Sequence, residues 1–194
     1  MSTTNQKKFL NQTPIQQFLV GGFHEKFVNV LARTAPTSIL ELGCGEGYLL
    51  EKIYHRLLHV KLLGLDNAEA ALTEGRRLFP SLHLQSGDIY HINQPDHSWD
   101  VVIASEVLEH LSHPERALQE LKRVAKRYVL LSVPNEPWFR LGNLGRGRHL
   151  RRFGNHPEHV NLWSYHGFVR FVGRWLKVES VINAFPWTIV LAHV

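Results

Sequence analysis

The sequence predicts a doubly wound α/β fold, in which seven short strands form a mostly parallel sheet with an antiparallel last strand. Short apolar runs alternate with segments of helical periodicity between residues 38 and 133, which is the pattern of βαβ units. A turn with glycine at positions 43, 45 and 47 follows the first of these runs. At the end of the chain, the strand-like runs 178–185 and 187–194 are separated only by Pro186, and so short a connection requires antiparallel pairing.

The bulk composition predicts one globular domain over residues 1–194. No apolar run approaches the ~18 residues that span a bilayer, and the polar start lacks a signal peptide's hydrophobic stretch. We therefore expect a cytoplasmic protein without a membrane partner. The formal charge of +5 weakly favours an anionic partner. The single cysteine, Cys44, lies inside the glycine turn, where we expect a small filler rather than a nucleophile.

Residues 1–35 are expected to form a helical cap. Apolar side chains recur at helical spacing over residues 14–34, and Gly21-Gly22 is expected to divide this segment into two helices. Such helices would either cover a ligand pocket or cap the sheet, and the sequence favours neither role.

The first predicted strand, residues 38–42, leads into the glycine turn and a helix over residues 48–58. Glycine lets the backbone turn tightly and approach a ligand where a Cβ would collide. The amides that open the helix have no partners within it, so they can donate to a polar ligand. The pattern predicts a binding loop.

The spacing of the turn narrows the ligand. A dinucleotide fingerprint has Gly-x-Gly-x-x-Gly, whereas here Gly47 comes one residue early and Glu41 stands two residues before Gly43. Glu-x-Gly-x-Gly-x-Gly resembles the first motif of the class I S-adenosylmethionine (SAM)-dependent methyltransferases. The resemblance implies a Rossmann-like sheet with a reversed last strand, SAM as cofactor, and the following residues at its amino-acid end: Glu41, Gly43, Cys44, Gly45 and Gly47.

The next two strands supply candidate residues for the rest of the cofactor. Residues 60–66 read as a buried strand ending in Asp66, and an acid there is placed to accept hydrogen bonds from both ribose hydroxyls. Asp66 would also suit the N-cap of a helix over residues 67–79, and both roles are compatible. After the third strand, residues 82–85, the resemblance implies that Asp88 binds the adenine amino group and Ile89 packs on the ring. It adds Asn67 and Ser105 to the cofactor-binding set.

The fourth strand, residues 99–105, runs into a polar cluster. The resemblance places the residues just past this strand where the methyl group emerges, and Glu106 and His110 are the candidate catalytic residues. If residues 106–110 form a helical turn, Glu106, Glu109 and His110 share a face. The cluster would then bind Mg²⁺ or Mn²⁺, let His110 act as a base, or brace the pocket floor.

The sequence Glu-Val-Leu-Glu-His resembles a motif of the ubiquinone-pathway O-methyltransferases, and equally one of the small-RNA 3′-terminal 2′-O-methyltransferases. In the RNA enzymes, two acids and a histidine bind a metal with a further histidine four residues before a tryptophan. Here His159 stands four residues before Trp163, and residues 132–135 resemble the segment that precedes that histidine. The resemblance thus implies a conditional metal set: Glu106, Glu109, His110 and His159.

The remaining elements complete the predicted sheet. Residues 112–115 have the form of a capping box that starts a helix to about residue 126, followed by a strand over residues 128–133 and a helix over residues 164–176. Between them, residues 135–163 are rich in glycine, arginine and aromatics. We expect either a substrate-side flap that clamps a phosphate-bearing group or a solvated basic loop.

The sequence therefore predicts a SAM-dependent methyltransferase that acts at oxygen on a small or medium-sized acceptor, and the net charge of +5 favours an anionic one. One alternative is metal-dependent 2′-O-methylation of an RNA 3′ end, which is less favoured because the chain lacks a separate RNA-binding domain. A second alternative is a SAM-binding module without turnover. The oligomeric state stays open.

Overall fold

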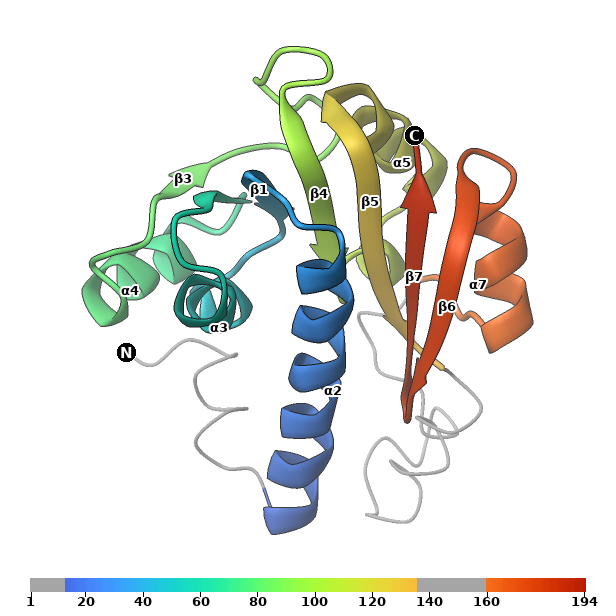
Figure 1. Cartoon of the computed structure of the whole chain (residues 1–194), viewed down its shortest axis with the longest axis horizontal. Coiled ribbons are helices and arrows are strands. Elements are labelled where there is room, and N and C mark those ends of the chain that lie inside the picture. Colours follow the sequence, from blue (N-terminus) through green and yellow to red (C-terminus); the bar gives the residue numbers. More distant parts are fainter. Residues whose placement is uncertain (1–12, 136–159) are drawn as a thin grey trace.

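A computed structural model of the chain describes residues 13–135 and 160–194. Its strands form one sheet in the order β3-β2-β1-β4-β5-β7-β6 (Figure 1). The strands are β1 (Ser38–Leu42), β2 (Lys61–Asp66), β3 (Leu84–Ser86), β4 (Trp99–Ser105), β5 (Ala125–Pro134), β6 (Lys177–Ala184) and β7 (Trp187–His193). The helices are α2 (Pro14–Arg33), α3 (Tyr48–Arg56), α4 (Glu69–Leu78), α5 (Pro114–Val124) and α7 (Tyr165–Val172), with a 3-10 turn η1 (Leu108–His110).

The predicted fold class is confirmed. Strands β3, β2, β1, β4 and β5 pair in parallel, while β7 pairs antiparallel with both β5 and β6. The connection between β6 and β7 is too short for a crossover helix, so the chain reverses there through a cis Phe185-Pro186 bond.

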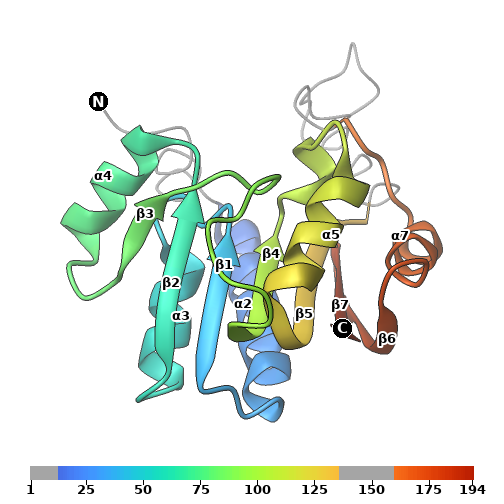
Figure 2. The same cartoon turned by 90° about the horizontal axis from the view of Figure 1, so that it is seen from above.

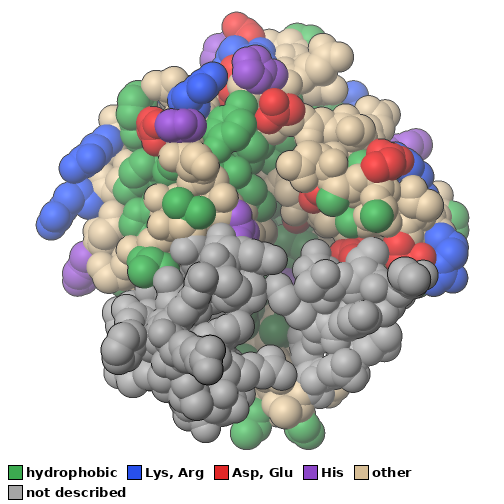
Figure 3. Space-filling view, turned by 180° about the vertical axis from the view of Figure 1, so that it is seen from behind, with side chains coloured by type: hydrophobic (Ala, Val, Ile, Leu, Met, Phe, Trp, Pro, Cys, Tyr) green, Lys and Arg blue, Asp and Glu red, His purple; other side chains and the backbone are tan. Residues whose placement is uncertain are grey.

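Helices cover both faces of the sheet (Figures 1 and 2). Successive side chains of a strand point to opposite faces, and β1 divides accordingly: Ile39 joins the core under α2, α3 and α4, whereas Leu40 joins the core under α5 and α7. In the view from behind, hydrophobic side chains gather in the upper middle of the surface, with charged side chains and histidines around them (Figure 3).

The expected break at Gly21-Gly22 is wrong, because α2 is one helix from Pro14 to Arg33. It begins with a capping box in which Thr13 accepts from the Gln16 amide and Gln16 accepts from the Thr13 amide. A glycine inside a helix costs about 1 kcal/mol relative to alanine. Apolar burial of the second half of α2 offsets that cost, since Phe23, Phe27, Val28, Val30 and Leu31 lie in the core.

The ends of three other elements differ from the prediction. The helix α5 begins at Pro114 with His113 as N-cap and no side-chain cap bond, so the expected capping box at Ser112 is wrong. Proline suits the first helical position because its missing amide would be unpaired there. The helix ends at Val124, and β5 begins directly at Ala125 instead of residue 128. The helix α7 starts after Ser164 as predicted but ends at Val172.

One cleft lies away from the glycine turn. It has a volume of about 550 Å³ and opens at the amino ends of β2 and β4, where Lys61 and Trp99 line it. This is the opposite end of the parallel strands from the glycine turn.

Among the described helices, none has the length and apolar character needed to cross a bilayer.

Candidate functional site

The carboxyl ends of three adjacent parallel strands bring the predicted cofactor residues to one edge of the sheet. Leu42, the last residue of β1, pairs with Leu65 of β2 and with Ala104 of β4. The glycine turn, Asp66 and Ser105 follow these three positions, so the register alone makes them neighbours. Ser105 itself shares a hydrogen bond of 3.0 Å with the Ser132 hydroxyl at the end of β5.

All three glycines of the turn have left-handed backbone angles, with φ of 71° at Gly43, 55° at Gly45 and 84° at Gly47. Glycine adopts this region without the steric cost that other residues meet. The Gly43 amide donates to the Leu65 carbonyl at 2.7 Å, and the Gly47 amide donates to the Cys44 carbonyl at 2.8 Å. The turn is therefore held tightly between β1 and β2.

Gly43 also fixes the distance between the turn and the segment that follows β4. A Cβ built on Gly43 would lie 2.4 Å from Cγ2 of Val107, which is far inside van der Waals contact. Only glycine leaves room for the two segments to pack this closely. The predicted cofactor loop and the predicted catalytic segment are thus in direct contact.

Asp66 bonds the glycine turn with one carboxylate oxygen and the start of α4 with the other. Oδ2 accepts from the Gly45 amide at 2.7 Å, and Oδ1 accepts from the Ala68 amide at 2.8 Å. The expected N-cap role is wrong in detail, because α4 begins at Glu69 with Ala68 as its N-cap and Asn67 stays exposed before it. A carboxylate has about four acceptor positions, so two remain for a ligand.

Glu41 is a buried acid with only 3% of its surface exposed, and its Oε2 has no hydrogen-bond partner among the described residues. Burial, and then the nearby carboxylate of Asp66, raise the pKa of Glu41 to about 8. A buried carboxyl beside a second carboxylate is stabilised in its charged form by a cation. The pair is therefore suited to a positively charged ligand.

Cys44 is buried, and burial raises the pKa of its thiol. Its Sγ packs over Gly64, where a Cβ would come within 2.8 Å of the sulfur. A neutral thiol is a poor nucleophile, so this environment favours the filler role expected from the sequence.

Asp88 and Ile89 follow β3 at the same edge of the sheet. The Asp88 carboxylate is exposed and accepts from the Tyr90 amide at 2.8 Å, while the half-buried Ile89 packs against the core. Both side chains therefore lie at the start of the loop between β3 and β4.

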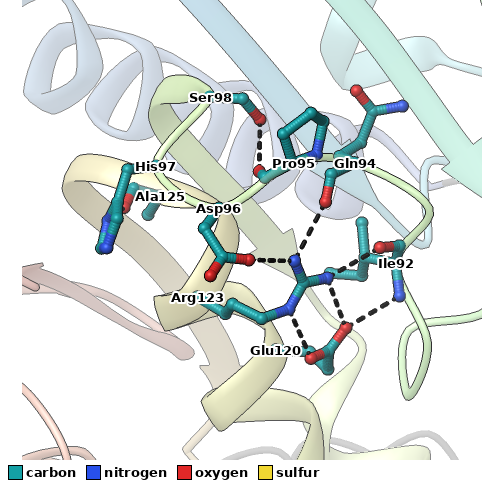
Figure 4. A network of polar contacts seen from close by, with 9 residues as sticks. All are labelled: Ile92, Gln94, Pro95, Asp96, His97, Ser98, Glu120, Arg123 and Ala125. Carbon is teal, nitrogen blue, oxygen red and sulfur yellow. Dashed lines mark hydrogen bonds and ion pairs between the residues drawn. The ribbon is translucent and has the colours of Figure 1, made fainter.

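That loop is fastened to α5 by one arginine (Figure 4). The Arg123 guanidinium donates five hydrogen bonds of 2.6–3.0 Å, to the Glu120 carboxylate twice, to the Asp96 carboxylate, and to the carbonyls of Ile92 and Gln94. The Glu120 carboxylate in turn accepts from the Ile92 amide at 2.9 Å. A planar fork of five donors suits this arrangement, which a lysine would not reproduce.

The expected helical turn over residues 106–110 is wrong. Glu106 has a left-handed φ of 60°, and the 3-10 turn begins only at Leu108. The Glu106 amide donates to the Ser132 carbonyl at 3.1 Å, and Oε2 of Glu106 accepts from Nε1 of Trp187 at 2.6 Å. Because residue 106 lies outside the helical turn, the i, i+3 and i, i+4 spacing does not bring its side chain into line with residues 109 and 110.

Glu109 is 1% exposed, and His110 is exposed. The Glu109 carbonyl accepts from the amides of Val160 and Asn161 at 2.8 and 3.0 Å. The Asn161 side chain donates to the carbonyls of Leu108 and Leu111, so it fastens the turn η1 to a segment about 50 positions later in the sequence. Within the described ranges, no group of three or more His, Cys, Asp and Glu side chains is arranged to hold a metal ion.

Several predicted features lie outside the described residues. These are the fourth candidate metal ligand, His159, and the arginine-rich stretch of the expected flap, residues 136–159.

Sequence reasoning missed Trp187, Arg123 and Asn161. Trp187 bonds a residue 81 positions earlier, Arg123 bonds a loop about 30 positions earlier, and Asn161 bonds carbonyls 50 and 53 positions earlier. No local pattern marks such partners. The only available signal was the strand order, which makes β7 a neighbour of β5.

The residues at the sheet edge fit the cofactor that the sequence resemblance implies. Glu41 offers a buried carboxylate oxygen to a cationic group, and Asp66 retains two acceptor positions for hydroxyls. The turn offers backbone close to the ligand without side chains at Gly43, Gly45 and Gly47. By contrast, the described residues do not complete a metal site.

Comparisons with known proteins agree with this fit. Residues 40–132 match the family model described as a methyltransferase domain. A probable S-adenosylmethionine-dependent methyltransferase of Mycolicibacterium smegmatis is 34% identical over 165 residues, which cover 84% of this chain and 61% of that protein. A trans-aconitate 2-methyltransferase of Methylobacterium nodulans is 34% identical over 98 residues, which cover 49% of this chain and 38% of that protein.

Among solved structures, a SAM-dependent methyltransferase from Aquifex aeolicus superposes with a TM-score of 0.71 at 18% sequence identity, over 100% of both chains. This similarity shows the fold. The chain spans less than two thirds of the length of each of the two curated relatives.

Proposed function

We propose that this chain is a class I SAM-dependent methyltransferase, as its methyltransferase-domain match and its similarity to a probable SAM-dependent methyltransferase support, and that it transfers the methyl group of SAM to an oxygen atom of a small or medium-sized acceptor. One observation carries the proposal: the buried carboxyl of Glu41 has an oxygen without a hydrogen-bond partner among the described residues, beside a turn of three left-handed glycines. A cationic ligand would supply that partner.

In this proposal, Glu41 binds the ammonium group of the cofactor's amino-acid end, and the backbone of the glycine turn lies against that end of the ligand. Asp66 accepts from the ribose hydroxyls with the two acceptor positions that Gly45 and Ala68 leave open. Asp88 accepts from the adenine amino group, and Ile89 packs on the ring. Asn67 and Ser105 complete the cofactor contacts.

When bound, SAM supplies a methyl group on a positively charged sulfur, which activates that carbon toward displacement. The protein then has to align the acceptor and exclude water, and where the acceptor oxygen belongs to a hydroxyl it also has to accept the proton of that hydroxyl. Glu106 and His110 are the proposed proton acceptors. Glu106 directly follows β4 and lies next to Val107, which contacts the glycine turn. Its position relative to the cofactor loop supports this role.

The test combines binding with turnover. Calorimetric titration of the protein with SAM is expected to give one site, and the Glu41→Ala variant is expected to bind at least about tenfold more weakly, because a charge-assisted hydrogen bond is lost. Release of S-adenosylhomocysteine is then measured with a panel of acceptors that begins with trans-aconitate, the compound in the name of one relative. A folded protein that does not bind SAM at millimolar concentration would contradict the proposal.

Two alternatives have distinct outcomes in the same assay. A SAM-binding module without turnover would bind SAM and release no S-adenosylhomocysteine with any acceptor. Metal-dependent 2′-O-methylation of an RNA 3′ end, with Mg²⁺ or Mn²⁺ on Glu106, Glu109, His110 and His159, is supported by the sequence of residues 132–135. It would require short single-stranded RNA, lose activity in a chelator, and show salt-dependent RNA affinity.

A further inference from the structure

The side chain of Trp187, the first residue of β7, donates a hydrogen bond to a predicted catalytic residue. Its indole Nε1 donates to Oε2 of Glu106 at 2.6 Å. An indole has a single N–H donor and no acceptor. A bond this short to a carboxylate is of the charge-assisted kind, roughly twice as strong as a bond between neutral groups. The single donor of the Trp187 indole is therefore used by Glu106.

Three elements hold the indole in place. Trp187 pairs with Pro134 of β5 and with Ala184 of β6, so its backbone lies inside the sheet. On the α2 side, the ring of Phe23 lies against the indole, with 4.9 Å between centroids and 37° between planes. Only 9% of the Trp187 surface is exposed. The donor is thus fixed before any ligand binds.

Glu106 is fixed at its backbone as well. Its φ of 60° places it in the left-handed region, and its amide donates to the Ser132 carbonyl at 3.1 Å. The indole bond adds a side-chain contact to these backbone constraints, and it forms when the protein folds, before any acceptor binds.

We propose that Trp187 is a positioning residue that orients the Glu106 carboxylate for removal of the acceptor's proton. This proposal rests on the proposed function of Glu106 as a proton acceptor. The stacking of Phe23 on the indole makes α2 the support of this arrangement, which gives the N-terminal helix a role in the site.

The first test needs no acceptor. The variant Trp187→Phe keeps an aromatic ring against Phe23 and removes the indole N–H. The indole resonance that is missing from its ¹H–¹⁵N NMR spectrum of the whole chain is therefore that of Trp187. That resonance is expected to move upfield in Glu106→Gln, because an amide oxygen is a weaker acceptor than a carboxylate. A Trp187 resonance that is unchanged in Glu106→Gln would overturn the proposal.

Trp99→Phe is the matched control. It also removes an indole N–H bond, of 3.1 Å to Gln94, but Trp99 begins β4 at the end far from Glu106. Its indole resonance is expected to be unchanged in Glu106→Gln.

The second test uses the hydroxyl-bearing acceptor with the highest turnover in the panel described above, because only such an acceptor has a proton for Glu106 to take. Trp187→Phe is expected to lower kcat about tenfold or more, with SAM affinity within about twofold of the wild type, while Trp99→Phe keeps both. The double variant with Glu106→Gln is expected to be no slower than Glu106→Gln alone, because the indole acts through that carboxylate.

The outcomes separate the two proposals. If Glu106→Gln loses turnover and Trp187→Phe keeps it, the positioning role is wrong and the role of Glu106 stands. If Glu106→Gln keeps full turnover, the proton-acceptor role is wrong, whether or not the Trp187 indole resonance moves in that variant.

Discussion

At the residue scale, the ionisation of Glu41 makes the stability of the fold depend on pH. Its folded pKa of about 8 lies above its ordinary value of 4.5, because burial and then Asp66 disfavour the charged form. Between these two values the folded state binds more protons than the unfolded state. The slope of unfolding free energy with pH is proportional to the protons bound in the unfolded state minus those bound in the folded state, so it is negative here. The stability contributed by the protonated carboxyl is present below pH 4.5 and is lost as pH rises through about 8.

We therefore predict that the cofactor-free protein loses stability on the order of 3–5 kcal/mol from this group between about pH 4.5 and pH 8. Urea unfolding across this range measures the loss, and Glu41→Gln, which cannot ionise, is the control that removes it. The same pH slope in wild type and Glu41→Gln would show that other groups cause the dependence.

Gly45 carries a second prediction at this scale. It has a φ of 55°, and its amide donates to Asp66. A valine would be strained there and would put a branched side chain on the proposed ligand face. Gly45→Val is expected to weaken SAM binding about 100-fold or more in calorimetry, with the sheet retained by circular dichroism. Unchanged affinity in a folded Gly45→Val protein would refute the assignment of the loop.

At the scale of elements, α2 shows how packing overrides a local signal. Gly21 and Gly22 would end many helices, yet a Cβ at either position meets nothing within 4 Å, so nothing in the surroundings requires glycine. The helix persists because its second half is anchored by Phe23 and Phe27, and because Lys26 donates to the Asn183 carbonyl of β6 at 3.1 Å.

Gly22→Ala is accordingly predicted to raise the unfolding free energy by about 0.5–1 kcal/mol, through helix propensity and reduced freedom of the unfolded chain. The comparison variant is Gly43→Ala, for which the expected sign is opposite, because φ is 71° and the new methyl group would collide with Val107. Urea midpoints measure both. A destabilised Gly22→Ala would mean that glycine is needed in α2 after all.

At the scale of the whole molecule, a ligand at the edge of β1, β2 and β4 contacts segments from different parts of the chain and should stabilise all of them together. S-adenosylhomocysteine at 100 times its Kd is expected to add about 2.7 kcal/mol. For a domain of this size that corresponds to a Tm increase of about 5–10 °C. NAD at the same concentration is the control, and no increase is expected with it. Equal increases with both ligands would argue against a SAM-specific site.

The sequence by itself determined the strands, the glycine turn, Asp66 at the end of β2 and the antiparallel β6–β7 pair, because periodicity, turn glycines and the shortness of a connection act between near neighbours in the chain. From these, the edge where Glu41, Gly45 and Asp66 meet could be predicted. The locations of Asp88 and Glu106 followed from the order of the strands.

Only the tertiary structure decided the conformation and partners of those side chains. The bond from Trp187 to Glu106, the three bonds from Arg123 to the loop before β4 and the continuity of α2 depend on which distant segments pack together. The left-handed φ of Glu106 likewise breaks the helical spacing that its sequence suggests. The hydrogen-bond partner of such a side chain comes from a segment that the strand order brings next to it. That partner cannot be inferred from residues nearby in the sequence.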